Sequence, residues 1–272
     1  MLSEAEFIFL MSVIADGLTW RGDQFVIAVV TLTMFVAGAS IASFAGLVAY
    51  RLPGILGFED SDVGIVSPPS HCDGCRRRLR THEIVPIAGW ILCRGRCKCG
   101  HAIPVVFPLV EALVGFGSVV IPPYVGDAWI GLLLVIAFWV CVLIAWCDIL
   151  HHLIPEGASV PLLFAGLLIS PIEADAWMRS AGAAAAAALL WISFLIVSKI
   201  RNIDAMSGGD IALAAAAGAW LGLAATPTFL IGACLIFIGY SAALRLRGIE
   251  WVPMGPALGS SMILTMLMTV HA

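Results

Sequence analysis

Long apolar runs separated by short polar stretches constrain this chain more than any other feature. Such runs favour membrane-spanning helices, because a helix satisfies its own backbone hydrogen bonds in lipid. We count eight segments long enough to span, at about residues 25–50, 104–122, 128–149, 154–172, 181–200, 208–224, 227–244 and 255–271. Only 12% of the residues are charged, against roughly 25% in soluble domains. The sequence therefore predicts an all-α polytopic membrane protein with about eight transmembrane helices.

The first apolar run, "FIFLMSVIADGLTW" at residues 7–20, is too short to span and is interrupted by Asp16. It follows Glu4 and Glu6 and contains no Lys or Arg, so it lacks the basic start of a cleavable secretory signal. We expect it to be retained as an interfacial helix. With the first span it forms a predicted N-terminal unit, residues 1–50.

The basic residues predict how the chain is oriented. Eight of the 14 Lys and Arg lie between Arg51 and Lys98, and the net charge of −4 gives no reason to expect nucleic acid as a partner. If this insert, residues 51–103, is cytoplasmic, alternation of the spans places four more basic residues on the same side: Lys199, Arg201, Arg245 and Arg247. The opposite side then receives only two of the 14 basic residues. The positive-inside rule thus predicts a cytoplasmic insert and an external N-terminus.

Two aspartates reach the cytoplasmic edge in this topology. Asp148 lies at the end of the third span and Asp210 at the start of the sixth. Two carboxylates held close in a partly desolvated site share one proton. One can then take a proton from water while the other protonates a substrate carbonyl oxygen. The pair predicts aspartic protease chemistry within a membrane.

Two glycines, Gly208 and Gly209, directly precede Asp210. They allow an unusual backbone shape and the close approach of a substrate strand or a neighbouring helix. Alternatively, Ser207 and the glycines simply begin a helix with Asp210 in its first turn, where the helix dipole favours an acid. Asp148 likewise has an alternative interpretation, as the polar end of a span.

Other polar residues are weaker candidates. Glu111 lies about seven residues inside the second span, and an intramembrane acid is a candidate for shaping the site or contacting substrate. A hydrogen-bonded structural role suits Glu111 equally well. We expect His151 and His152 to be a solvated loop pair rather than metal ligands.

The insert holds five of the eight cysteines, in a C-x2-C-x21-C-x-C pattern with one further cysteine. In a reducing cytoplasm this pattern favours a metal site over disulfides. Four thiolates satisfy a tetrahedral Zn²⁺ with no open position, which predicts a structural zinc site. The expected ligands are Cys72, Cys75, Cys97 and Cys99. The possible substitutes are Cys93, His71 and His101.

Several motifs occur in an order that resembles the type IV prepilin leader peptidases, membrane aspartyl proteases of the GxGD class. In chain order they are "SFAGLVAYRLP", "SHCDGC", "RGRCKCGHAI", "FPLVEALVG", "WCDILHHLIPEGASVP", "SGGDIAL" and "VPMGPALG", from Ser43 to Gly259. By position, the resemblance implies that Asp148 and Asp210 are the two catalytic aspartates. It also implies that residues 104–272 form a transmembrane aspartyl protease domain.

The chain departs from the family's pattern at a few positions. In the motif M-G-x-G-D-x-K-L, Ser207 replaces the first glycine and Ala212 replaces the lysine. Gly46 stands where Asn is frequent, and Met254 where Phe is usual. The second cysteine pair is one residue shorter than the family's C-x2-C. None of these departures removes a carboxylate, although loss of the lysine leaves less positive charge near the site.

The resemblance implies a function. Such an enzyme removes the basic leader from type IV prepilins or type II secretion pseudopilins at the cytoplasmic face of the bacterial inner membrane. Many members also methylate the new N-terminus with S-adenosylmethionine, so the expected partners are a prepilin and membrane lipid. Two alternatives remain: a catalytically lapsed assembly scaffold, suggested by Ser207 and Ala212, and an ion-coupled transporter, since paired intramembrane acids also build proton pathways.

Overall fold

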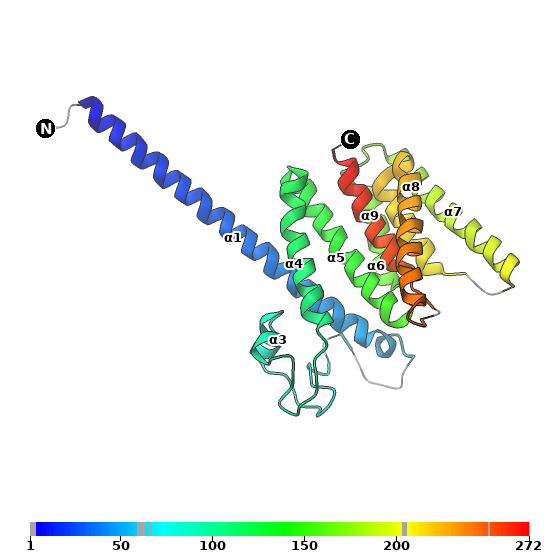
Figure 1. The fold of residues 1–272 in the computed structure, drawn as a ribbon. Coiled ribbons are helices and arrows are strands. Elements are labelled where there is room, and N and C mark those ends of the chain that lie inside the picture. Colours follow the sequence, from blue (N-terminus) through cyan, green and yellow to red (C-terminus); the bar gives the residue numbers. More distant parts are fainter. Residues whose placement is uncertain (1–3, 59–63, 66, 203–205, 250, 272) are drawn as a thin grey trace.

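The chain is a helical membrane protein (Figure 1). The computed structural model describes residues 4–58, 64–65, 67–202, 206–249 and 251–271, with side chains from residue 24 onward. Its helices are α1 (Glu4–Ile55), α2 (Thr81–Ile84), α3 (Ala88–Leu92), α4 (Val106–Val125), α5 (Ala128–His151), α6 (Glu156–Ile169), α7 (Ala176–Arg201), α8 (Gly208–Arg245) and α9 (Gly255–Thr269). The all-α membrane fold is thereby confirmed. The predicted interfacial helix at residues 7–20 falls where side chains lie outside the description.

All eight predicted apolar segments are helical, but they are divided differently among the elements. Five helices are long and apolar enough to cross a membrane: α1 from Gln24, α4, α5, α7 and α8. Helices α6 and α9 are shorter apolar helices, and the segments 208–224 and 227–244 both lie within α8. The chain is therefore a multi-pass membrane protein whose eight apolar segments occupy seven helices.

Helix α8 doubles back at Gly222, whose φ of 73° and ψ of 173° are not helical. Figure 1 shows its gold first arm rising and its orange second arm returning beside it. Tyr240 in the second arm interacts electrostatically with Asp210 at the start of the first. In a straight helix about 45 Å would separate these residues. Only glycine suits this turn, for two reasons. The positive φ of Gly222 disfavours a side chain, and an added Cβ would lie 2.8 Å from the Glu173 side chain.

Helix α5 lies between two groups of helices. It packs against α1 and α4 on one side and against α6 and α9 on the other, while α8 packs against α6, α7 and α9. The contact of α7 with α8 is made by glycines: a Cβ on Gly182 would lie 2.5 Å from the carbonyl oxygen of Gly218. Small residues of this kind let membrane helices approach closely.

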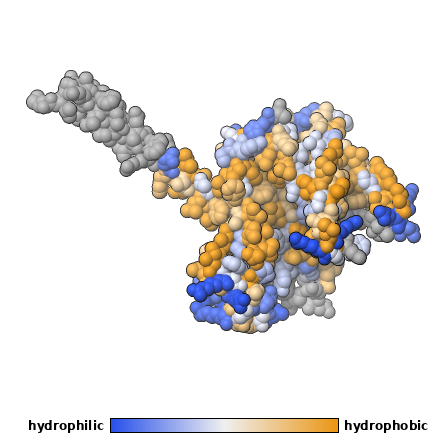
Figure 2. All heavy atoms as spheres, in the orientation of Figure 1, coloured by the Kyte–Doolittle hydropathy of each residue, from blue (hydrophilic) through white to orange (hydrophobic). Residues whose placement is uncertain are grey.

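One end of the bundle is polar. Figure 2 shows hydrophobic residues over the flanks of the helices and hydrophilic residues over the insert at the lower end. The insert follows α1 and precedes α4, and it contains only the short helices α2 and α3. The last turn of α5 and the first turn of α8 lie at this same end (Figure 1), so the fold brings the insert, Asp148 and Asp210 to one face.

Candidate active site

Asp148 is held in the last turn of α5 by the start of α9. Its side chain is 5% exposed, and its Oδ2 accepts a hydrogen bond of 2.6 Å from the backbone N–H of Gly255. A Cβ on Gly255 would lie 2.7 Å from that oxygen, so the close approach requires glycine. The exposed N–H groups of a helix start favour a negative charge. Sequence reasoning did not assign Gly255 to the site, although "VPMGPALG" was among the quoted motifs.

Asp210 lies in the first turn of α8 and is 8% exposed. Its backbone N–H donates to the Ser207 hydroxyl at 3.3 Å, so Ser207 is the N-cap of this helix. Its Oδ1 is buried and has no hydrogen-bond partner among the residues that the structure describes. A buried carboxyl oxygen without a partner is costly, so it is available to a ligand.

The two glycines before Asp210 begin the helix in the ordinary way. Neither Gly208 nor Gly209 has a positive φ, so the unusual backbone shape considered for them is not found. The close approach is found at one of them: a Cβ on Gly209 would lie 2.7 Å from the Cβ of Ile154, whereas Gly208 faces open space. Gly209 thus lets the loop after α5 pack against the start of α8.

The two aspartates lie near enough for their charges to interact. Tyr240, on the returning arm of α8, interacts electrostatically with both. Its hydroxyl oxygen is buried without a hydrogen-bond partner in the described part of the chain. Sequence reasoning missed Tyr240, because nothing in its apolar segment sets it apart until α8 folds back.

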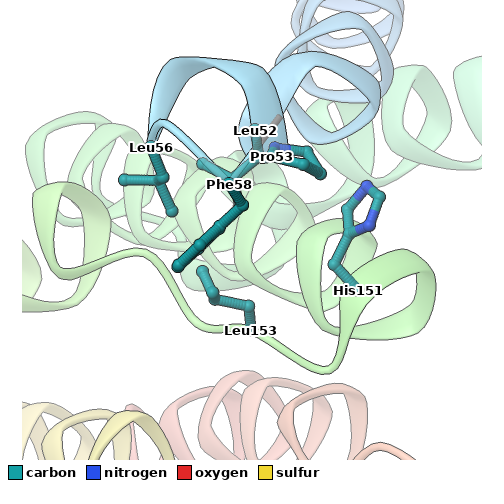
Figure 3. Close-up of a pocket in the computed structure, with 6 residues that line it drawn as sticks. All are labelled: Leu52, Pro53, Leu56, Phe58, His151 and Leu153. Atoms are coloured by element: carbon teal, nitrogen blue, oxygen red, sulfur yellow. The ribbon is translucent and has the colours of Figure 1, made fainter. Parts of the chain in front are cut away.

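The two histidines after Asp148 lie apart from the cysteines. His151 borders a small cavity of about 220 Å³ between the ends of α1 and α5, and Figure 3 shows its side chain directed towards the end of α1, among apolar residues. His152 is the C-cap of α5, with a positive φ of 52°, and its charge interacts with that of Asp148.

Glu111 is not brought to the aspartates. It is 8% exposed on α4, and its Oε2 accepts a hydrogen bond of 2.6 Å from the backbone N–H of Ile87 in the insert. It lines a cavity of about 530 Å³ bounded by the insert, α1, α4 and α5, whose walls include neither Asp148 nor Asp210. The hydrogen bond to Glu111 therefore links α4 to the insert.

The four expected cysteines gather in the insert. Their sulfur atoms all lie within 4.8 Å of one another, and the distances Cys72 to Cys99 and Cys75 to Cys97 are 3.7 and 4.0 Å. A tetrahedral Zn²⁺ with bonds of about 2.3 Å places its sulfurs about 3.8 Å apart. The cluster can therefore hold a metal ion. The considered substitutes lie outside it: Cys93, His71 and His101.

The shortened cysteine pair reaches the cluster because its turn is also shorter. In the first turn the carbonyl of Cys72 accepts from the N–H of Arg76, which has a φ of 57°. In the second turn the carbonyl of Cys97 accepts from Gly100, at a φ of 89°. The second turn thus closes one residue earlier.

An ion pair lies beside the cluster. The Arg77 guanidinium donates to both carboxylate oxygens of Glu83, at 3.0 and 2.8 Å, and to the Cys97 sulfur at 3.6 Å. The bonds from Arg77, followed by the one from the Arg80 N–H, lower the pKa of Glu83 to about 2. The Cys99 backbone N–H and then Arg77 lower the pKa of Cys97 to about 6. The lowered pKa of Cys97 favours the thiolate that a metal requires.

The chain is similar to known proteins over most of its length. Residues 36–123 match the Bacterial Peptidase A24 N-terminal domain, and residues 134–242 match the Type IV leader peptidase family. The Prepilin leader peptidase/N-methyltransferase of Aeromonas hydrophila is 30% identical over 92% of this chain and 91% of its own length. That of Dickeya chrysanthemi is 32% identical over 82% and 85%. The chain belongs to the type IV leader peptidase family. No solved structure matches it.

The structure accounts for several departures of this leader peptidase family member. Ser207 supplies the cap of α8. Ala212 follows Asp210 by two residues in α8. Residues so spaced do not face each other on a helix, so a lysine at position 212 would extend from the side of α8 opposite the carboxylate. Gly46 lies against Trp146 and Phe107 at the large cavity. Met254 packs on the hydrophobic core as the N-cap of α9.

Proposed function

We propose that this protein is a membrane aspartyl endopeptidase that removes the basic leader from type IV prepilins or type II secretion pseudopilins. The observation that carries the proposal is the convergence of Asp148 and Asp210, which are buried on different helices with interacting charges. The basic residues of the insert and of the ends of α7 and α8 support a cytoplasmic location for this face. In a bacterium the membrane is then the inner membrane.

The two carboxyl groups have different surroundings, which support different roles for them in this proposal. Asp148 accepts the Gly255 N–H and is the ionised base, whereas Asp210, with its unpartnered Oδ1, carries the proton. Asp148 takes a proton from water as the water oxygen bonds to the scissile carbonyl carbon, and Asp210 protonates the carbonyl oxygen. When the carbonyl re-forms, its proton returns to Asp210. The C–N bond breaks, and the leaving amine takes the proton from Asp148.

Cleavage of a prepilin by the purified protein in liposomes tests this proposal. We expect Asp148→Asn and Asp210→Asn each to lower the rate by about 10²-fold or more, because each removes a proton-transfer group. Asp175→Asn is the matched control, since Asp175 caps α7 far along the chain from either carboxylate. Unchanged cleavage by either dyad variant would overturn the assignment.

The same proposal includes N-methylation of the new N-terminus and a structural zinc ion. When bound, S-adenosylmethionine would supply the methyl group that the amine nitrogen of the cleaved pilin receives. Cys72, Cys75, Cys97 and Cys99 would hold Zn²⁺ with no open position, so it organises the insert rather than reacting.

Three units follow from this assignment. They are an N-terminal segment with the first span, a cytoplasmic cysteine-rich insert, and a transmembrane protease domain from residue 104. Helix α1 continues to Ile55 and α4 begins at Val106, so the insert lies between these helices. The second unit contains the four clustered cysteines, and the third carries both aspartates.

A further inference from the structure

Four exposed apolar side chains lie close together in the sequence of the insert. They are Ile84, Val85, Ile91 and Leu92, with exposed fractions between 47 and 67%. All four belong to residues 84–92, "IVPIAGWIL", which contain no charged residue. Exposed apolar side chains gathered in this way mark an interaction surface. We call residues 84–92 the apolar segment.

The apolar segment is a compact turn rather than an open loop. The backbone N–H of Gly89 donates to the Val85 carbonyl at 2.8 Å. A Cβ on Gly89 would lie 2.5 Å from the Glu83 carbonyl oxygen. Gly89 therefore lets α3 pack directly on the end of α2, and the exposed apolar side chains before and after it belong to one structural unit.

Two hydrogen bonds hold the apolar segment at the level where α4 begins. The backbone N–H of Ile87, the N-cap of α3, donates to Glu111 Oε2 at 2.6 Å. The indole N–H of Trp90 donates to the carbonyl of Ile103, just before α4, at 3.0 Å. Glu111 lies in the second turn of α4, about 7.5 Å along its axis from the first residue. Figure 1 accordingly shows α3 near the lower end of α4.

The start of α4 marks the boundary of the hydrocarbon core. Helix α4 has 20 residues, so it is about 30 Å long, which is the thickness of that core. Val106 and Leu109 in its first turn are exposed apolar side chains on the flank of the bundle. The apolar segment, held at this level, therefore continues the lipid-facing surface of α4 onto the insert.

Basic side chains flank the apolar segment in the chain on both sides. All of these are exposed: Arg76, Arg78, Arg80, Arg94, Arg96 and Lys98. The acid that directly precedes the segment, Glu83, is paired with Arg77. Apolar side chains bordered by Lys and Arg are typical of elements that lie in the interface of a membrane with anionic lipids.

We propose that the apolar segment is a membrane anchor of the insert. Its exposed side chains enter the boundary between headgroups and acyl chains on the insert's side of the bilayer, and the flanking basic side chains contact anionic lipid phosphates. The insert is thereby held at a third point, besides its connections to α1 and α4. The level of the segment and its basic flanks favour lipid over a second copy of this chain.

Photolabelling by lipid tests the anchor in the wild-type protein. The full-length chain is placed in nanodiscs of phosphatidylcholine and phosphatidylglycerol, in which some phosphatidylglycerol carries a diazirine on its acyl chain near the headgroup. Trypsin then releases the segment within residues 81–94, because Arg80 and Arg94 precede the two cleavage points. We expect this peptide to carry the lipid label. An unlabelled peptide would refute the anchor.

Variants at two positions provide a matched comparison. Ile91→Asn combined with Leu92→Asn should lower the labelling about fivefold or more, because polar side chains do not enter the acyl boundary. Ile91→Val combined with Leu92→Met stays apolar and should label as the wild type does. Neither side chain lines the cavity of about 530 Å³, so both variants leave its walls unchanged. Equal labelling of the two double variants would overturn the proposal.

The lipid composition and the number of chains per nanodisc distinguish the possible partners. Labelling should fall about twofold or more when both the bulk lipid and the diazirine lipid are phosphatidylcholine, because the basic flanks lose their anionic partners. Unchanged labelling would refute the part assigned to the basic residues. Labelling in nanodiscs that hold one chain supports lipid as the partner. A segment that is shielded only where two chains share a nanodisc would assign it to a second copy instead and refute the anchor.

The aspartate variants separate this inference from the peptidase proposal. Asp148→Asn and Asp210→Asn should be labelled as the wild type is, because both lie on helices outside the insert. Prepilin cleavage by a protein whose segment is unlabelled would remove the anchor and leave the peptidase intact. A labelled segment, with cleavage unaffected by the aspartate substitutions, would leave the anchor and remove the peptidase assignment.

Discussion

At the scale of single residues, the site depends on groups that position or complement the two carboxylates. Gly255 brings a backbone N–H to Asp148 because it has no side chain. Tyr240 places a buried hydroxyl near both acids. Gly255 and Tyr240 can each be substituted while both carboxylates stay in place. Such variants therefore test how the carboxylates are positioned and complemented without removing them.

We expect Gly255→Ala to lower the cleavage rate at least tenfold, because its Cβ would lie 2.7 Å from Asp148 Oδ2 and displace the carboxylate. The initial rate of prepilin cleavage, compared with that of Gly239→Ala, is the measurement. Gly239 has nothing within 4 Å of an added Cβ. Equal rates for the two variants would mean that the Gly255 contact does not set the position of Asp148.

Tyr240→Phe should lower kcat about tenfold or more while KM and the melting temperature stay close to those of the wild type. Its hydroxyl makes no hydrogen bond among the described residues, so its loss removes no visible stabilising contact, whereas a donor aimed at the reacting atoms is worth this much or more. Steady-state kinetics and thermal melting measure both effects, with Tyr124→Phe on α4 as the control. A lower melting temperature with unchanged kcat would indicate a structural role instead.

At the scale of elements, the position of Asp210 depends on how α8 packs. Its first arm lies against α7 through Gly182 and Gly218, and it turns back at Gly222. A side chain at the glycine contact would push the arm, and Asp210 with it, away from α5.

Gly218→Leu should therefore destabilise the protein by about 1 to 3 kcal/mol, as overpacking typically does, and should reduce cleavage as well. Gly239→Leu is the matched control on the returning arm, because an added Cβ there meets open space. Thermal melting in detergent gives the comparison. Similar melting temperatures for the two variants would show that the glycine contact is dispensable.

At the scale of the whole molecule, α5 lies between two groups of helices. Asp148 on α5 meets the start of α9, whereas α1 and α4, which flank the insert in the chain, pack on the other side of α5. The insert has two short helices and a cluster of four sulfurs that could hold a metal ion, so we expect a bound metal to contribute more to its order than a hydrophobic core does.

Metal analysis of the purified protein should find about one zinc per chain, as a closed four-sulfur site requires. Cys97→Ser and Cys99→Ser should lose it, whereas Cys93→Ser should retain it, because Cys93 lies outside the cluster. Strong chelation should expose the insert to proteolysis, because it would remove the cross-link among Cys72, Cys75, Cys97 and Cys99. Zinc loss in Cys93→Ser alone would contradict this ligand set.

The sequence by itself determined the features that depend on local pattern. Hydropathy predicted the apolar helices, the placement of Lys and Arg predicted one basic face, and cysteine spacing predicted which four sulfurs gather. Each of these is set by residues close together in the chain.

Only the tertiary structure decided which side chains meet across helices. The rotation of each helix and the turn at Gly222 bring Tyr240 near Asp210, and Gly255 reaches Asp148 across 107 residues. Glu111 faces the insert rather than the aspartates for the same reason. No local pattern specifies these contacts, because an apolar segment in lipid carries no polar face that would fix which side of it turns towards a neighbour.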